Sequence, residues 1–522
     1  MNKNQVGGFN AKVALCLLVV VYIFNFIDRQ ILTILAEDIK ADLGISDSDI
    51  GFLFGTAFGV FYSVVGIPMG KLADTWNRKN LISIGLAFWS LMTFLSGLAK
   101  SFFALSIYRF GVGIGESTAS PAAYSLLSDY FSPKVRATVL AIYSSGLYIG
   151  AGIGLFLGGS ILDTWNGWYP DTTLAPFGLK GWQVAFMAVG FPGIVLAVIT
   201  YAFIREPKRG LSEGIETKPS SSPFFDTFKE FLGLTPLSLI GSKNLLNKLF
   251  FNFIMGFILF LSCFYLYKFT EDFLQWTAWG IGAYLVFSWI QTLKTRDRVA
   301  FEIMFKNKAL LFSLVSVPFL PFVSYGYTAF QPAFYIRNHG MEASEIGLLI
   351  GILTIVGSFL GVVGGGYLGD RLRVKYVNAK LYLIIAACFL TAITCLGFIY
   401  TSNTNLSLVW NFLYHLVSAS YLGCAASTVT DLVLPRMRGM AAAFFILTLS
   451  MIGLALGPYT VGQLSDVFFA QGMTSGDGLR LSMALVLIVL IIPVIFISIA
   501  CFNLKQEEDN LLNKARSLGE EI

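Results

Sequence analysis

Charged residues are scarce in this sequence. Asp, Glu, Lys and Arg make up only 13% of the 522 residues, whereas 56% are apolar; a soluble domain carries about 25% charged residues. This composition excludes an ordinary soluble enzyme. The apolar stretches are long enough for membrane helices, whereas an outer-membrane barrel would show alternating segments of about ten residues. We therefore expect an all-α polytopic membrane protein.

Patterns for metals, disulfides and nucleotides are also missing. The chain has two histidines, His339 and His415, and none of its six cysteines forms a C-x-x-C pair. Neither a metal site nor a disulfide framework is indicated. No G-x-x-x-x-G-K-[ST] loop is present, so ATP is not the direct energy source. We expect no metal, no cofactor, no nucleic-acid partner and no enzymatic activity.

The sequence does contain a series of helix-length apolar stretches. Two of them, 13–35 and 103–127, are interrupted by charged residues, and the others are free of charge. At roughly 20 residues per span, the series predicts about 14 membrane helices. The uncharged stretches are 51–70, 80–99, 137–162, 182–204, 249–267, 273–293, 309–336, 346–369, 381–400, 406–430, 439–465 and 481–504.

The basic residues predict the orientation of these spans. If the N-terminus is cytoplasmic, most of the 36 Lys and Arg fall on inner loops, as the positive-inside rule requires. We expect a multi-pass protein of the inner cell membrane, with both termini cytoplasmic, that works as a monomer. The few basic residues on outer loops are Lys40, Lys100, Lys180, Lys268, Arg337 and Arg480.

The chain also repeats itself. Ser-Asp-Ile-Gly at 48–51 and Gly-Lys-Leu-Ala-Asp at 70–74 return 296 residues later as Ser-Glu-Ile-Gly and Gly-Tyr-Leu-Gly-Asp. Two six-helix bundles in parallel repeat are the layout of the major facilitator fold. We expect bundles at 1–204 and 309–504, a cytoplasmic linker at 205–308 with an inserted two-helix hairpin at about 245–293, and a cytoplasmic tail at 505–522.

Two motifs carry a family resemblance. Gly70-x-x-x-Asp74-x-x-x-Arg78-Lys79 resembles the loop signature between helices 2 and 3 of major facilitator transporters, and residues 366–371 resemble its second copy. The run 109–131, together with Ile27-Asp28-Arg29-Gln30, is similar to the Spinster family. That resemblance, which in detail covers residues 20–165, implies export of lysophospholipids or sphingosine 1-phosphate, coupled to protons in bacterial members.

Four charged residues interrupt the first and fourth spans: Asp28, Arg29, Arg109 and Glu116. A charge near mid-membrane costs at least about 2.5 kcal/mol and is functional by default. The helical rise places Asp28 and Arg109 at the same depth, so we expect them to pair. Arginine stays charged, so Arg29 and Arg109 are candidates for binding an anion. Burial raises the pKa of a carboxyl group and a nearby arginine lowers it, so the carboxyl can change its protonation state when its arginine contact changes. Glu116, with Asp28, is therefore the candidate for proton coupling.

The second half of the repeat has no counterpart of these charges. The repeat aligns them with Ser324, Tyr325, Asn411 and Ser418. A pair that only locked helices together would be needed in both halves, which favours coupling or substrate binding over a structural role. We expect Ser324, Tyr325 and Asn411 to contact substrate. His415 is either a further polar contact or hydrogen-bonded packing.

Charges on the inner loops are candidates for gates. Asp74 and Arg136 fall on neighbouring loops, and Asp370 and Arg438 repeat them in the second half. Exposed loop charges usually contribute little to stability, but two copies in register favour latches that hold the inner gate shut. The gating candidates are Asp74, Arg78, Arg136, Asp370, Arg371 and Arg438.

Glycines recur at every fourth position of one span, at 146, 150, 154 and 158. This pattern permits close helix packing, and the family resemblance adds the alternative of a rocking interface.

Three functions remain open. The leading one is a proton-coupled, alternating-access transporter of an amphipathic anionic lipid, with protons and membrane lipids as its other partners. A proton-coupled carrier of small organic anions is the first alternative, because an Asp-Arg pair also suits carboxylates. An uncoupled lipid scramblase is the second, although it would not need a titratable Glu116.

Overall fold

The computed structural model describes residues 6–209, 212, 221–434 and 437–518. This part of the chain forms helices, turns and loops and contains no strand. Within it, 11 helical segments are long and apolar enough to cross a membrane. The three other predicted spans also fall on helices: α6 (Phe102–Glu116) with α7 (Ala119–Tyr130), α12 (Phe273–Arg296) and α18 (Thr404–Asp431). The predicted all-α membrane fold is confirmed.

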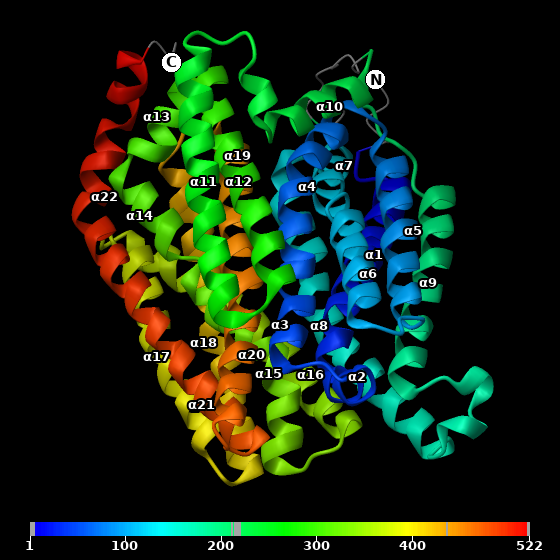
Figure 1. Cartoon of the computed structure of the whole chain (residues 1–522). Helices are drawn as coiled ribbons and strands as arrows, with labels where there is room; N and C mark the ends of the chain where they lie inside the picture. Colours follow the sequence, from blue (N-terminus) through cyan, green and yellow to red (C-terminus); the bar gives the residue numbers. More distant parts are fainter. Residues whose placement is uncertain (1–5, 210–211, 213–220, 435–436, 519–522) are drawn as a thin grey trace. The chain divides into compact units, whose positions relative to one another are not determined.

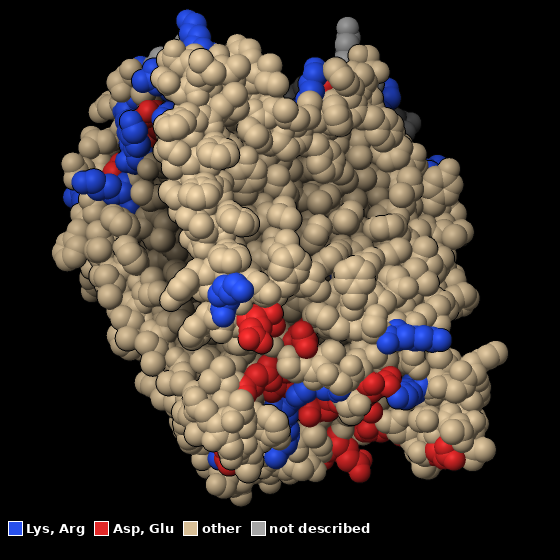
Figure 2. All heavy atoms as spheres, viewed as in Figure 1, with Lys and Arg blue, Asp and Glu red and all other residues tan. Residues whose placement is uncertain are grey.

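The surface of the molecule fits this fold. Figure 2 shows one face on which Lys, Arg, Asp and Glu gather toward two ends, while the surface between them is almost free of charge. Such a belt is what the hydrocarbon core of a bilayer requires, since charged side chains are costly there.

The residues divide into two compact units, each of which contains a short piece of the other sequence half. Unit 1 consists of Met1–Ile45, Ala57–Phe231 and Gly340–Ile355. Its helices (Figure 1) are α1 (Phe9–Ile34), α2 (Ala36–Leu43), α4 (Thr56–Thr75), α5 (Arg78–Ser96), α6, α7, α8 (Pro133–Trp168), α9 (Gly181–Phe203), most of α10 (Pro223–Gly233) and the start of α16 (Ala343–Arg373).

Unit 2 consists of Ser46–Thr56, Leu232–His339 and Val356–Ile522. Polar side chains cap several of its helices; Ser46, for example, caps α3 in a capping box with Asp49. Its helices are α3 (Asp47–Phe54), α11 (Leu245–Thr270), α12, α13 (Arg298–Lys306), α14 (Lys308–Ser316), α15 (Phe319–His339), the rest of α16, α17 (Ala379–Tyr400), α18, α19 (Arg438–Thr448), the π-helix η6 (Leu449–Leu454), α20 (Ala455–Ala470), α21 (Ser475–Val486) and α22 (Ile491–Ser517).

The glycine stripe of α8 packs against α1 inside unit 1. A Cβ atom on Gly150 would lie 2.3 Å from the carbonyl oxygen of Ile23, and one on Gly158 would lie 2.5 Å from the side chain of Ile34. Both distances are shorter than van der Waals contact, so these positions need glycine. The stripe is therefore close helix packing within the first sequence half.

A different face of α8 crosses the start of α16, also in unit 1. Cβ atoms on Gly347 and Gly351 would lie 2.4 Å from Leu155 O and 2.7 Å from Gly152 O. At the end of this crossing, a carboxylate oxygen of Asp163 accepts a hydrogen bond of 2.6 Å from the Ser344 amide. The two backbones therefore touch, and an acid of one helix caps the N-terminus of the other.

Unit 2 contains a matching crossing between α3 and α20. Cβ atoms on Gly51 and Gly55 would lie 2.5 Å from the carbonyl oxygens of Pro458 and Leu454. Gly51 and Gly55 are the repeat counterparts of Gly347 and Gly351, 296 residues away. The internal repeat is therefore visible as a pair of related glycine crossings.

The predicted hairpin is present as α11 and α12, and it is attached to α20 and η6. The indole N–H of Trp279 donates to the carbonyl oxygen of Met451 at 2.9 Å. The hydroxyl of Tyr459 donates to the Asp272 carboxylate at 2.6 Å, and the ring of Trp276 meets that of Tyr459 edge to face. Burial raises the pKa of Asp272, which lies in the turn between the two helices.

Candidate functional site

The buried charges of unit 1 form a cluster on α1 and α6, next to aromatic rings of α1 and α4. The Nε atom of Arg29 donates to Glu116 at 2.7 Å, with Glu116 fully buried and the Arg29 side chain 13% exposed. The guanidinium of Arg29 lies over three rings, at 4.6 Å from Phe26, 4.4 Å from Phe58 and 4.7 Å from Tyr62. Stacking and the ion pair together fix the plane of this guanidinium.

Asn25 is a member of this cluster that the sequence did not single out. It is buried, and its side chain lies close to Glu116. Its position one turn before Arg29 places both residues on the same face of α1. That spacing was the signal in the sequence that could have identified it.

The expected pairing of Asp28 with Arg109 was wrong. Arg109 donates from Nη1 to the main-chain oxygen of Asp28 at 3.1 Å, and neither carboxyl oxygen of Asp28 has a hydrogen-bond partner among the described residues. The Asp28 carboxyl instead faces Trp89 and Thr93 of α5. Successive helix residues lie about 100° apart, so Asp28 and Arg29 leave α1 in different directions.

In unit 2, the predicted contact residues lie on α15 and α18. Asn411 and His415 are buried, while Ser324 and Tyr325 are partly exposed. Nε2 of His415 lies 3.4 Å from the side-chain nitrogen of Gln331, and the Tyr414 hydroxyl donates to the carbonyl oxygen of Ser324 at 3.4 Å. This cluster offers amide, hydroxyl and imidazole groups, whereas the cluster in unit 1 offers charges.

Arg78 is the centre of a charged cluster at the end of α5. It is fully buried and forms ion pairs with Glu206 at 2.7 Å and Asp129 at 2.5 Å. It also donates to the Ser125 hydroxyl at 2.9 Å. Arg78 therefore joins α5, α7 and the start of the linker.

Unit 2 has a related cluster around Lys380. This residue pairs with Asp431 and contacts the Ser427 hydroxyl, while Arg373 pairs with Asp431 at 2.9 Å and Glu508 at 2.6 Å. The sequence analysis missed these residues. Asp129 and Asp431 are 302 residues apart in the sequence. The same offset relates Arg78 to Lys380, Ser125 to Ser427 and Glu206 to Glu508.

Two of the other predicted gate residues, Arg136 and Asp370, have contacts beside these clusters. Arg136 donates to the Ser128 carbonyl oxygen and to Ser212, and Asp370 lies 3.5 Å from Lys380. Asp74, Arg371 and Arg438 are exposed. Their role as latches stays a prediction.

The N-terminus of α3 carries a further cluster that the sequence did not reveal. Asp47, which is 4% exposed, forms a bidentate ion pair with Arg337 through two contacts of 2.7 Å. The Ser465 hydroxyl donates to the same carboxylate. Asp466 accepts hydrogen bonds from the amides of Asp47 and Ser48 at 3.0 and 2.7 Å. The cluster ties α3, α15 and α20 together.

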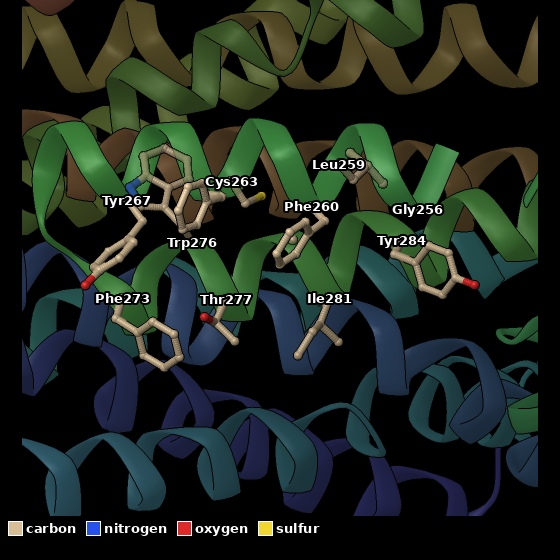
Figure 3. Close-up of a pocket in the computed structure, with 12 residues that line it drawn as sticks. Gly256, Leu259, Phe260, Cys263, Tyr267, Phe273, Trp276, Thr277, Ile281 and Tyr284 are labelled. Atoms are coloured by element: carbon tan, nitrogen blue, oxygen red, sulfur yellow. The ribbon is translucent and has the colours of Figure 1, made fainter. Parts of the chain in front are cut away.

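A groove of about 420 Å³ lies along the inserted hairpin (Figure 3). Its lining includes Phe260, Cys263, Trp276, Ile281 and Tyr284. Among the described residues, those that line this groove are apolar, aromatic or uncharged polar side chains.

The profile of the Major Facilitator Superfamily matches residues 18–458. This chain belongs to the Major Facilitator Superfamily. It is therefore a membrane transporter and not an enzyme, and its fold is the major facilitator fold that the internal repeat predicted.

Individual relatives support the Spinster resemblance. The chain is 25% identical over 461 residues to an MFS-type efflux pump of Mycolicibacterium smegmatis, which covers 88% of this chain and 86% of the relative. It is 24% identical over 473 residues to protein spinster homolog 1 of Homo sapiens, and the match covers 87% of this chain and 73% of the relative. A probable L-galactonate transporter of Escherichia coli is 25% identical over 245 residues, 47% of this chain and 49% of the relative.

Among solved structures, the fold resembles a bacterial homolog of the human lysosomal transporter Spinster in an inward-facing, unoccupied conformation. The TM-score is 0.69 at 24% identity, and the match covers 96% of this chain and 98% of that chain. The chain is thus a major facilitator transporter related to the Spinster proteins.

Proposed function

We propose that this protein is a proton-coupled carrier of an amphipathic anionic lipid, of the lysophospholipid or sphingosine 1-phosphate type, in the inner membrane with both termini cytoplasmic. The observation that carries the proposal is the buried ion pair between Arg29 and Glu116. Its arginine is in part exposed, and its carboxylate is fully enclosed. An anion and a proton can therefore act on the same pair.

The chemistry of this pair couples the two ligands. An anionic head group that reaches Arg29 competes with Glu116 for the guanidinium, which binds phosphate and carboxylate through the same N–H groups. Protonation of Glu116 removes the competing charge. Leaving either partner alone in the interior costs about 3–5 kcal/mol, so substrate binding and proton binding favour each other at this site.

Asp28 is the second proton-binding candidate. Its carboxyl is fully buried and has no hydrogen-bonded cation among the described residues. A buried ionised carboxyl without such a partner is expensive. We assign Asp28 to proton storage next to the exchanging pair.

Arg109 and the uncharged cluster on α15 and α18 have supporting roles in this proposal. Arg109 donates to the main chain of α1 at Asp28 and so positions the helix that carries Arg29. Ser324, Tyr325, Asn411 and His415 supply polar contacts without charge.

The first test addresses proton coupling. Glu116→Gln keeps the size and polarity of the side chain but cannot ionise, so transport driven by a pH gradient should be lost while substrate still binds. Uptake into proteoliposomes and a binding assay on the same preparation measure the two effects. Glu37→Gln, on the short helix α2 outside the spans, is the matched control. Gradient-driven transport by Glu116→Gln at the wild-type rate would contradict the role.

The second test addresses the substrate. Lysolipids of one head group and increasing chain length should bind progressively tighter in detergent at equal free ligand, because each buried CH₂ contributes about 0.8 kcal/mol. The relative named as a probable L-galactonate transporter supports the alternative, a carrier of small organic anions. A flat series, together with tight binding of a short organic acid, would replace the lipid by that alternative.

A further inference from the structure

The linker helix α10 exposes its apolar side. Its four phenylalanines, Phe224, Phe225, Phe228 and Phe231, are exposed by 61%, 57%, 55% and 37%. They follow one another at spacings of one, three and three residues, which places them in one stripe along the helix. A stripe of this width normally faces the core of a protein.

The opposite side of α10 is polar and faces the protein. Thr227 is buried at 5% exposure, and Asp226 and Glu230 are half-buried. In water this arrangement would be inverted, because apolar side chains are driven inward and carboxylates outward. The orientation of α10 therefore indicates that its outer surroundings are apolar.

The position of α10 in the chain identifies those surroundings. The helix lies between the spans α9, which ends at Phe203, and α11, which begins at Leu245, on the side that the basic residues predict to be cytoplasmic. The ring of Phe224 lies 5.1 Å from that of Trp76, at the inner end of α4. With 11 residues, α10 is about 16 Å long and too short to span a bilayer.

Two further features fit apolar surroundings. Later in the chain, in unit 2, Leu237, Ile240 and Leu246 are also exposed, by 57%, 67% and 83%. On α10 itself, the Lys229 ammonium lies 4.5 Å from the centre of the Phe225 ring. A lysine beside inserted aromatic residues is suited to a lipid phosphate at the membrane surface.

We propose that α10 is an interfacial membrane helix, which inserts its phenylalanine stripe into the cytoplasmic leaflet and places Lys229 among anionic head groups. This part of the linker is then bound to the membrane surface and is not surrounded by the cytoplasm. This role is independent of the transported substrate.

Spin labels on the full-length chain test the proposal. In a version with the six cysteines replaced by alanine, labels at Phe228→Cys and Phe231→Cys are compared with a label at the exposed Ser221→Cys just before the helix. The protein is reconstituted in vesicles of phosphatidylethanolamine and phosphatidylglycerol. We expect the helix labels to be reached by oxygen and protected from a water-soluble nickel chelate, at a depth of about 5–10 Å, and the Ser221 label to show the reverse.

Two other occupants of the stripe give distinct results. A second copy of the chain would protect the labels from both reagents and broaden their spectra through spin–spin contact, and an aqueous position would make all three labels alike. Either result overturns the proposal. Replacing phosphatidylglycerol by phosphatidylcholine should reduce the depth, and Lys229→Gln should remove that lipid dependence.

A photoreactive benzoylphenylalanine at position 228 provides a test that keeps all six cysteines. We expect illumination in the same vesicles to give an adduct with the mass of one lipid, and position 221 to give none. A cross-linked dimer as the main product, or equal lipid labelling at both positions, would contradict the proposal.

Discussion

The two glycine crossings, α8 with α16 and α3 with α20, share one plan but differ in chemistry. Both bring backbones together at repeat-related glycines. Both also end with an aspartate that caps the partner helix, Asp163 in one and Asp466 in the other, at positions 303 residues apart. Only the second contains the pair of Asp47 with Arg337, because the repeat counterpart of Asp47 is Ala343.

This difference shows which features a close helix crossing requires and which one is present in only one of the two crossings. Two touching backbones require glycine, and an N-terminus with free amides requires an acceptor, so these features occur in both crossings. The ion pair is not required by the geometry. A helix cap contributes about 1 kcal/mol, whereas loss of one partner of a buried ion pair costs about 3–5 kcal/mol. We therefore expect removal of Asp47 to destabilise the protein more than removal of either capping aspartate.

The largest predicted effect comes from removing the ion pair. Asp47→Ala gives this crossing the residue that the other crossing has, and it leaves Arg337 buried without its carboxylate. We expect a loss of about 3–5 kcal/mol in the free energy of unfolding, measured by denaturant titration in detergent. The double variant Asp47→Ala with Arg337→Met should recover most of the loss, and no recovery would mean that the pair is not the cause.

An intermediate effect, equal in the two crossings, is predicted for the glycines. Gly51→Val and its counterpart Gly347→Val place a side chain against a carbonyl oxygen, so each should cost about 1–3 kcal/mol through overpacking. Gly66→Val, on α4 where a Cβ meets nothing within 4 Å, is the control. If Gly347→Val were as mild as this control, the α8 and α16 helices would not touch as described.

The smallest predicted effect distinguishes the two caps. Asp466 accepts two main-chain hydrogen bonds and Asp163 accepts one from Ser344. Asp466→Ala should therefore destabilise more than Asp163→Ala, with each loss near the 0.5–2 kcal/mol range of a helix cap. Thermal melts of both variants in one detergent provide the comparison, and a reversed order would show that the number of amide bonds does not set the effect.

Much of the fold could be predicted from the internal repeat. The depth of the buried charges in the membrane could be predicted from the rise per residue of a helix. Depth was not enough to predict partners. Asp28 and Arg109 lie at the same depth, but the direction in which a side chain leaves its helix decides which residues it contacts. Asp28 and Arg29 point about 100° apart on α1. Arg29 therefore contacts Glu116, whereas Asp28 faces α5. The sequence also showed the glycines of α8 but not which helix each face of α8 would meet.

The attachment of the hairpin has a consequence for how the protein is made. The indole of Trp279 donates to a carbonyl oxygen 172 residues further along the chain, and Asp272 accepts from a hydroxyl 187 residues away. At a synthesis rate of about 5–20 residues per second, the indole waits about 9–34 s for its acceptor to be made. If the hairpin inserts during synthesis, the Trp279 indole and the Asp272 carboxylate enter the membrane before their hydrogen-bond partners exist. The insertion machinery must then keep these two groups solvated for that time.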